Sequence, residues 1–163
     1  MIKDKSVSIK LTIELVPESC FYSNVRSHLP KSKWDIIRKQ AYREAGYKCE
    51  VCGGVGPRHP VECHEVWSYD DQTRTQKLER LIALCPACHM VKHIGFANIQ
   101  GKGEEAADHL AKINGWTREQ AGDYIAESFR LWDERNSIEW ESDLSHLDSL
   151  EESDVTTFFE WQR

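Results

Sequence analysis

Hydrophobic and polar residues alternate strictly near the start of the chain, in the segment SVSIKLTIELV (residues 6–16). One set of alternate positions is entirely apolar and comprises Val7, Ile9, Leu11, Ile13 and Leu15. Because successive side chains of a β-strand point to opposite faces of a sheet, this pattern predicts a half-buried strand. Pro17, Asn24 and Pro30 then favour a loop over residues 17–32.

Residues 32–45 have the spacing of an α-helix. Ser32 stands where an N-cap is expected and Gly46 where a helix stops, and the apolar positions are Trp34, Ile37, Ala41, Tyr42 and Ala45. The other side of this helix is basic and carries Lys31, Lys33, Arg38, Lys39 and Arg43. Such a face is either simply solvated or contacts phosphate groups.

Two further helices are predicted in the second half of the chain. One covers about residues 104–114 and ends at Asn114-Gly115. The other begins at Thr117, which forms a capping box with Gln120, and continues to about residue 135. Its apolar stripe, which we expect in the core, consists of Ala121, Tyr124, Ile125, Phe129 and Trp132.

The C-terminal part is less regular. Residues 138–144 predict a short strand, which we expect to pair with the N-terminal one. The acidic residues 148–154 are typical of a loose tail. The motif FFEW at residues 158–161 is apolar enough to dock on this chain or on a partner.

Length and composition limit the class of protein. The 163 residues, 40% apolar and 29% charged, are typical of one compact globular domain. No apolar run approaches the ~18 residues of a membrane helix, so we expect no membrane partner. The N-terminus lacks the continuous apolar region of a secretory signal, and we therefore expect a cytoplasmic protein.

Charge argues against one function class and leaves another open. The net charge of −6 is wrong for a protein that coats nucleic acid non-specifically. However, the first 48 residues contain ten Lys and Arg against five acids, whereas residues 136–162 contain eight acids and no Lys or Arg. A local positive cleft, and with it a nucleic-acid substrate, remains possible.

Four of the six cysteines form two Cys-x-x-Cys pairs, Cys49 with Cys52 and Cys85 with Cys88, separated by 32 residues. Each pair offers two thiolates from one tight turn, and two such turns complete a tetrahedral structural Zn²⁺ site. The alternative, two separate redox dithiols, is disfavoured because a thioredoxin-like site needs only one such motif, in a βαβ setting.

Three histidines predict a second metal centre. His89 and His93 are four residues apart on a helix that begins near Cys85, with Pro86 in its first turn, so their side chains share one face. His64 lies on a predicted strand. Three imidazoles leave open positions on a metal ion, as a catalytic site requires. The alternative is a structural or regulatory role, or histidines that simply cap and pack.

Residues 47–95, with the runs YKCEVCGG, VECHEVW and LIALCPACHMVKH, resemble the HNH endonucleases of the cysteine-bracketed subgroup. The resemblance implies an α+β fold with a ββα-metal core stapled by a four-cysteine zinc site. We expect this core at residues 47–100, after an N-terminal strand and basic helix (1–46) and before a helical extension (101–147) and an acidic tail (148–163). It also implies hydrolysis of phosphodiester bonds in DNA, with a catalytic Mg²⁺ or Mn²⁺ for which Ni²⁺ or Zn²⁺ can substitute.

The site residues follow from the same resemblance. In one alignment His64, His89 and His93 bind the catalytic ion and Glu65 is the general base, with His64 and His89 also counted among the catalytic residues. A break in the strand between residues 63 and 66 would let His64 and Glu65 both reach the ion. In the alternative alignment Cys63 is the ligand and His64 the base.

Arg80 stands where the family has its middle Asn, so another residue must orient the base. We expect Arg80, together with Lys39 and Arg43, to contact nucleic acid.

The sequence therefore favours a metal-dependent DNA endonuclease whose target is chosen by a targeting protein, by DNA structure or by a modification. The alternatives are a non-catalytic zinc-binding module that binds nucleic acid or protein, and a nuclease that acts on RNA.

Overall fold

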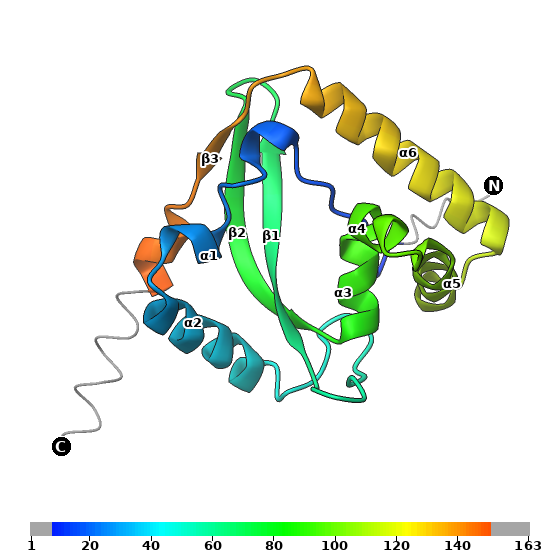
Figure 1. Cartoon of the computed structure of the whole chain (residues 1–163), viewed down its shortest axis with the longest axis horizontal. Helices are drawn as coiled ribbons and strands as arrows, with labels where there is room; N and C mark the ends of the chain where they lie inside the picture. The colour runs from blue at the N-terminus through cyan, green and yellow to red at the C-terminus, as the bar shows by residue number, and fades with distance from the viewer. Residues whose placement is uncertain (1–7, 151–163) are drawn as a thin grey trace, which may run out of the picture.

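The computed structural model describes residues 8–150 and shows an α+β fold, with a small three-stranded sheet flanked by helices (Figure 1). Its elements, in chain order, are η1 (Glu18–Cys20), α1 (Val25–His28), α2 (Lys31–Glu44), β1 (Glu62–Asp70), β2 (Thr75–Leu84), α3 (Pro86–Lys92), α4 (Ile94–Ile99), α5 (Gly103–Asn114), α6 (Arg118–Asn136) and β3 (Glu141–Asp143).

The sheet has the order β1-β2-β3, and β1 with β2 forms a long antiparallel hairpin. Pairing runs from Glu62 opposite Leu84 to Val66 opposite Arg80 without interruption. The register then shifts between Val66 and Trp67. A shift of this kind is a β-bulge, which bends the hairpin and increases its twist.

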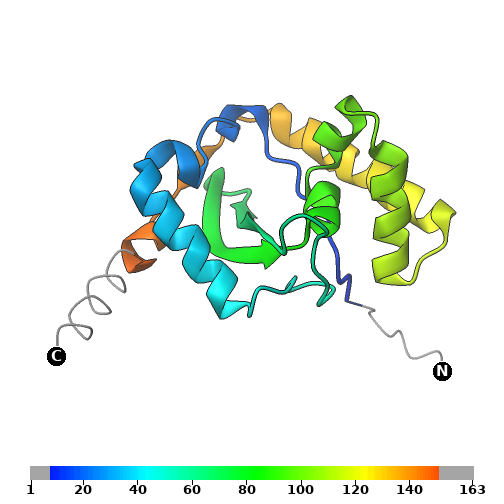
Figure 2. The same ribbon diagram turned by 60° about the horizontal axis from the view of Figure 1, so that its bottom comes forward.

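Helices cover the two faces of this sheet, as Figure 2 shows: α1 and α2 lie on one side and α3 with α4–α6 on the other. The larger core cluster lies between the sheet and α3, α5 and α6, and includes Ile82, Leu84, Val91 and Leu110. A smaller cluster on the α1–α2 side is built around Val25, Leu78 and Leu147. The hairpin therefore divides the molecule, and a residue's strand position decides which side it serves.

The strand predicted over residues 6–16 is wrong for the described part of that range. Residues 8–16 have no strand partner, although Leu11 and Ile13 are buried as the alternation predicted. Their backbone groups are bonded instead to helix residues: Leu11 N donates to Asn114 Oδ1, Ile13 N to Tyr124 Oη and Glu14 N to Lys92 O. Alternation reports which side chains are buried, but the partners that would define a strand lie far along the chain.

The N-terminal loop and first long helix also differ in detail from the prediction. Residues 17–32 are not wholly irregular, because η1 and α1 fall within them. Helix α2 begins at Lys31, with Pro30 as its N-cap residue, so Ser32 is not the cap. Its end is as predicted, since Gly46 adopts a positive φ of 61° just beyond the helix.

The C-terminal helices are confirmed. Helix α5 ends at Asn114, followed by Gly115 in the left-handed conformation, and Thr117 and Gln120 form the predicted capping box of α6. The short strand is present as β3, but it pairs in parallel with Thr75–Lys77 of β2 and not with the N-terminal segment. Residues 148–150 continue a helical turn that starts at residue 146, so the tail is ordered there.

The rest of the acidic tail and the FFEW motif lie outside the described residues. Among the residues that are described, no helix is both long enough and apolar enough to cross a membrane.

Candidate functional site

The four paired cysteines come together at the amino end of α3. The Sγ atoms of Cys49, Cys52, Cys85 and Cys88 all lie within 4.8 Å of one another. Three of these residues are buried, and Cys52 is exposed. This cluster could hold a metal ion such as Zn²⁺, because four thiolates converging from two turns are the donor set of a structural zinc site.

Local backbone geometry explains how the first pair is presented. Gly53 N donates to Cys49 O and Cys49 N donates to Gly54 O, which closes a tight turn around the pair, and Gly53 has a φ of 73°. Gly54 N also donates to Cys52 Sγ at 3.4 Å. Glu50 ties the turn to β2, since its Oε2 accepts from Ala83 N at 2.7 Å.

The second pair is presented by the start of α3. Cys85 is the N-cap residue, Pro86 occupies the first turn as predicted, and Cys88 follows one turn later. A side chain at Gly56 would collide with Pro86, since a Cβ there would lie 2.6 Å from Pro86 Cδ. Glycine at position 56 therefore lets the loop before β1 pack directly on this end of α3.

The electrostatics of the cluster favour a bound cation. A hydrogen bond from the Cys88 thiol lowers the pKa of Cys49 to about 4, whereas the pKa of Cys88 itself is raised. Cys49 is thus ionised, whereas Cys88 retains a proton that a metal ion would displace. His109 of α5 adds a further contact, with its Nε2 3.2 Å from Cys88 Sγ. An imidazole N–H in that position stabilises a thiolate.

His64 from β1 and His89 from α3 meet His93, the residue that follows α3, at the other end of that helix. Their ligand atoms lie within 4.8 Å of one another, and the ring centroids are 4.8–5.3 Å apart. His64 is buried, His89 is half-buried and His93 is exposed. The predicted i, i+4 pair on one helix face and the strand histidine are therefore brought together, and the cluster is open on one side.

Two carboxylates fix the orientation of two of these rings. Glu62 Oε2 lies 2.5 Å from His89 Nδ1, and Glu14 Oε2 lies 2.6 Å from His64 Nε2. A carboxylate that hydrogen-bonds the outer nitrogen of a histidine selects the tautomer whose other nitrogen faces a metal. Burial raises the pKa of Glu62 and Glu14, but hydrogen bonds from the histidines outweigh it, so both pKa values are below the usual range.

The closest approach within the cluster also suits a cation. His89 Nε2 lies 3.1 Å from His93 Nε2, and Glu62 occupies the Nδ1 side of the His89 ring, so Nε2 of His89 faces the cluster. The protein around the ring, and then the charges of His89 and His64, lower the pKa of His93 to about 3, although one edge of this residue is open to solvent. The lowered pKa keeps His93 neutral, which is the protonation state that metal binding needs.

Glu14 belongs to a buried charge network. Its Oε1 accepts from Lys92 Nζ at 2.9 Å, and the same ammonium donates to Thr12 Oγ1 at 2.7 Å. The side chain of Lys92 is only 5% exposed and that of Glu14 22%. Because Lys92 neutralises Glu14, the N-terminal segment can carry a carboxylate to His64 from 50 residues away at an acceptable desolvation cost.

The structure does not bring Glu65 to the histidines. Its Oε1 accepts from Val25 N at 2.8 Å, on the α1–α2 side of the sheet. The expected break between residues 63 and 66 is absent, because the bulge follows Val66 and strand alternation sends Glu65 to the face opposite His64. Cys63 lies on that same opposite side, beside α2, and burial raises the pKa of its thiol to about 12.

The three residues predicted to contact nucleic acid lie on two separate elements. Lys39 and Arg43 are exposed on α2. Arg80 is on β2, with 61% of its side chain exposed and its guanidinium 3.9 Å from Glu50. Arg38, counted with the exposed basic face, is half-buried and donates to Asp35 Oδ1 at 2.8 Å.

Sequence reasoning missed three residues that the structure places around these clusters, namely Glu14, Glu62 and His109. Glu62 had a signal, since it is two residues before His64 on the same strand and must share its face. The other two had none, because their partners come from distant segments. Comparisons of the chain with protein-family models, with curated proteins and with solved structures gave no match.

Proposed function

We propose that this protein is a metal-dependent endonuclease of the HNH type that hydrolyses phosphodiester bonds in DNA. The observation that carries the proposal is the convergence of His64, His89 and His93 from a hairpin and the helix that follows it, next to a four-cysteine cluster. This arrangement is what the resemblance in residues 47–95 implies for a ββα-metal core.

The two clusters would bind metal ions with different roles, one structural and one catalytic. Cys49, Cys52, Cys85 and Cys88 would hold a structural Zn²⁺, and the three histidines would hold the catalytic Mg²⁺ or Mn²⁺, with Ni²⁺ or Zn²⁺ as substitutes. The catalytic ion, when bound, supplies charge stabilisation for the phosphorane-like transition state and the leaving oxygen. Glu14 and Glu62 keep the rings of His64 and His89 in the orientation that this requires.

We assign to Glu62, in place of Glu65, the role of the carboxylate on which activity depends. Glu62 lies on the histidine face, its side chain is 35% exposed, and hydrogen bonds keep its carboxylate ionised at neutral pH. Its Oε2 holds the ring of His89 from the nitrogen that is turned away from the ion, and its Oε1 lies 2.7 Å from His59 Nε2, which fixes the carboxylate in turn. Glu65 is committed to the backbone of Val25 on the other face.

Nicking of supercoiled plasmid DNA by the full chain, with Mg²⁺ and with Mn²⁺, tests the proposal. We expect conversion to open circles by the wild type and none by His89→Ala, while elemental analysis finds one zinc in both. The absence of nicking with any divalent ion, by a folded protein that holds its zinc, would overturn the assignment. Cleavage of RNA but not DNA would overturn the substrate.

The second candidate is a non-catalytic zinc-binding module for nucleic acid or protein. Glu65 on the far face and Arg80 in the place of the family's Asn favour it. The same assay separates the two candidates, since a binding module retains DNA binding in the presence of Mg²⁺ and leaves the plasmid intact. A targeting protein partner remains part of either proposal, because the net charge of −6 gives the chain little general affinity for DNA.

A further inference from the structure

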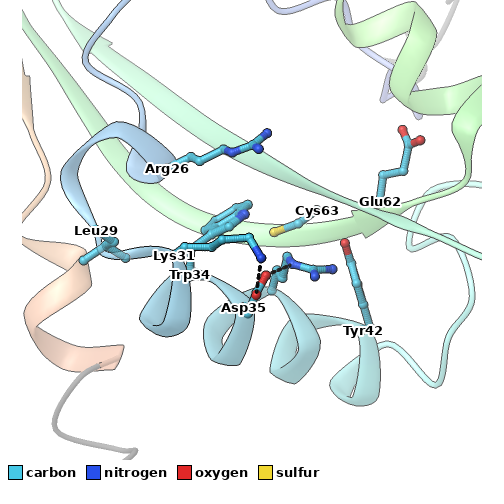
Figure 3. Close-up of a pocket in the computed structure, with 9 residues that line it drawn as sticks. Arg26, Leu29, Lys31, Trp34, Asp35, Tyr42, Glu62 and Cys63 are labelled. Carbon is cyan, nitrogen blue, oxygen red and sulfur yellow. Dashed lines mark hydrogen bonds and ion pairs between the residues drawn. The ribbon is translucent and has the colours of Figure 1, made fainter.

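A recess of about 540 Å³ lies between α2 and the beginning of β1; we call it the α2–β1 recess (Figure 3). Helix α2 lines it with side chains from a single face, at a spacing of three and four residues: Lys31, Trp34, Asp35, Arg38 and Tyr42. Glu62 and Cys63 line it from β1, and Arg26 reaches over it from α1. Lys39 and Arg43 come about 100° further around the helix, beside the recess.

The cations of the recess are not all neutralised. Asp35 serves both Arg38, at 2.8 Å, and Lys31, at 3.6 Å. The other acid, Glu62, is bonded to His59 and His89. Within residues 8–150, the guanidinium of Arg26 makes no ion pair or hydrogen bond. The recess therefore presents at least one unpaired positive charge, which suits a phosphate group.

The recess is also lined by two aromatic side chains, whose flat rings are largely apolar. Trp34 and Tyr42 stand on either side of Arg38 along α2, and Figure 3 shows the hydroxyl of Tyr42 directed toward Glu62. A phosphate alone needs no recess of this size, and aromatic side chains are surfaces on which nucleobases stack. Phosphate-binding cations together with aromatic rings are the chemistry that recognises a nucleotide.

The recess also adjoins the candidate catalytic centre. Glu62 lines the recess and is also hydrogen-bonded to His89, so its side chain connects a ligand in the recess to the histidine cluster. A base paired inside a duplex is stacked and cannot enter such a recess, whereas an unpaired base can.

We propose that the α2–β1 recess binds an unpaired nucleotide of the DNA strand, next to the phosphodiester held at the histidine cluster. This rests on the proposed function and gives it a substrate class: single-stranded DNA, or duplex DNA with unpaired nucleotides. Arg26 binds the phosphate of this nucleotide, and Trp34 and Tyr42 contact its base.

Binding without cleavage tests the site. The full, zinc-loaded chain is titrated without Mg²⁺ or Mn²⁺ into a fluorescein-labelled DNA oligonucleotide, single-stranded or annealed to its complement, and anisotropy is recorded. We expect the single strand to bind about tenfold more tightly than the duplex. Arg26→Gln should weaken single-strand binding about tenfold and reduce the slope of log K against log salt by about 0.7. Lys102→Gln, the same charge change at an exposed position before α5, should alter neither.

Photocrosslinking locates the base. A single strand carrying 5-iodouracil should form its adduct at Trp34 or Tyr42, as identified by mass spectrometry. Equal affinity for duplex and single strand, equal behaviour of Arg26→Gln and Lys102→Gln, or adducts confined to other elements would overturn the proposal. Tighter binding of the RNA oligonucleotide of the same sequence would overturn the choice of DNA. Nicking is measured separately, so the two proposals can fail independently. If the wild type nicks plasmid but fails these binding tests, the nuclease function stands and the binding site in the recess is wrong. If it binds single strands at the recess but does not nick plasmid, the binding site stands and the nuclease function is wrong.

Discussion

The cysteine and histidine clusters share α3, but the chain assembles them by different means. The sulfurs come from two short turns whose backbone hydrogen bonds are local, and three of the four cysteines are buried. The imidazoles are oriented by carboxylates, one of them from Glu14 in the N-terminal segment, and His93 is open to solvent. Each half of the first cluster is thus a turn that the local sequence can form, and the hairpin joins the halves. The second cluster also depends on a segment 50 residues before His64.

The largest effect is expected from breaking the cysteine cluster. Cys88→Ser should lose the metal and unfold residues 47–60, because zinc binding in small modules contributes about 10–16 kcal/mol. Elemental analysis and thermal unfolding measure this. Cys63→Ser, which changes a cysteine outside the cluster, should leave both unchanged. A wild type that unfolds at the same temperature in strong chelator and contains no zinc would contradict the prediction.

Opening the second cluster should have the opposite profile. His89→Ala and His93→Ala should abolish nicking while one zinc per chain and the unfolding temperature are retained, because their side chains point away from the sulfurs. His146→Ala serves as the matched control and should nick normally. Full activity in either of the first two variants would remove the histidine cluster from the mechanism.

The contrast between the clusters also explains how much the sequence could predict. The cysteine turns, the pair His89 and His93 and the capping box at Thr117 depend on contacts between near neighbours, so spacing alone locates them. The position of residues 8–16 depends on Asn114, Tyr124 and Lys92, and that of β3 on β2. Such long-range partners leave no local pattern.

The position of Glu65 shows a different kind of error. Its assignment as the base required a break in the strand before Val66, but the bulge comes one residue later. Strand alternation, which the sequence did contain, correctly separates the faces of His64 and Glu65 and puts Glu62 with His64. Strand alternation therefore predicts the position of Glu65 better than its alignment with the family motif does.

Glu14 provides the most direct test of the dependence on distant segments. Glu14→Gln leaves the ammonium of Lys92 buried without a counter-charge, which should lower the free energy of unfolding by about 3–5 kcal/mol. The double variant Glu14→Gln/Lys92→Met should recover part of that loss, because no buried charge remains unpaired. Glu139→Gln, at an exposed position, is the control. Chemical denaturation measures all of them, and equal stability of Glu14→Gln and the wild type would contradict the expected role.

A pair of matched substitutions in β1 sharpens the comparison between the two faces of the strand. Glu62→Gln should reduce the rate of nicking up to ~10²-fold, because it removes the carboxylate that orients His89, with the zinc retained. Glu65→Gln should leave the rate within about twofold and cost ~1 kcal/mol at most, because the amide oxygen still accepts from Val25 N. Single-turnover nicking rates decide the matter, and the reverse ranking would restore the original assignment of Glu65.

The sharing of α3 has a consequence for which insertions and deletions the chain can tolerate. Cys85, Cys88, His89 and His93 fall within nine consecutive residues, and each residue added to a helix turns everything after it by about 100°. One residue inserted between Cys88 and His89 would rotate the imidazoles away from His64 while the sulfurs stay in place. The hairpin tip at residues 71–74 has no such constraint from either cluster, so natural variation in length is expected there and not in α3.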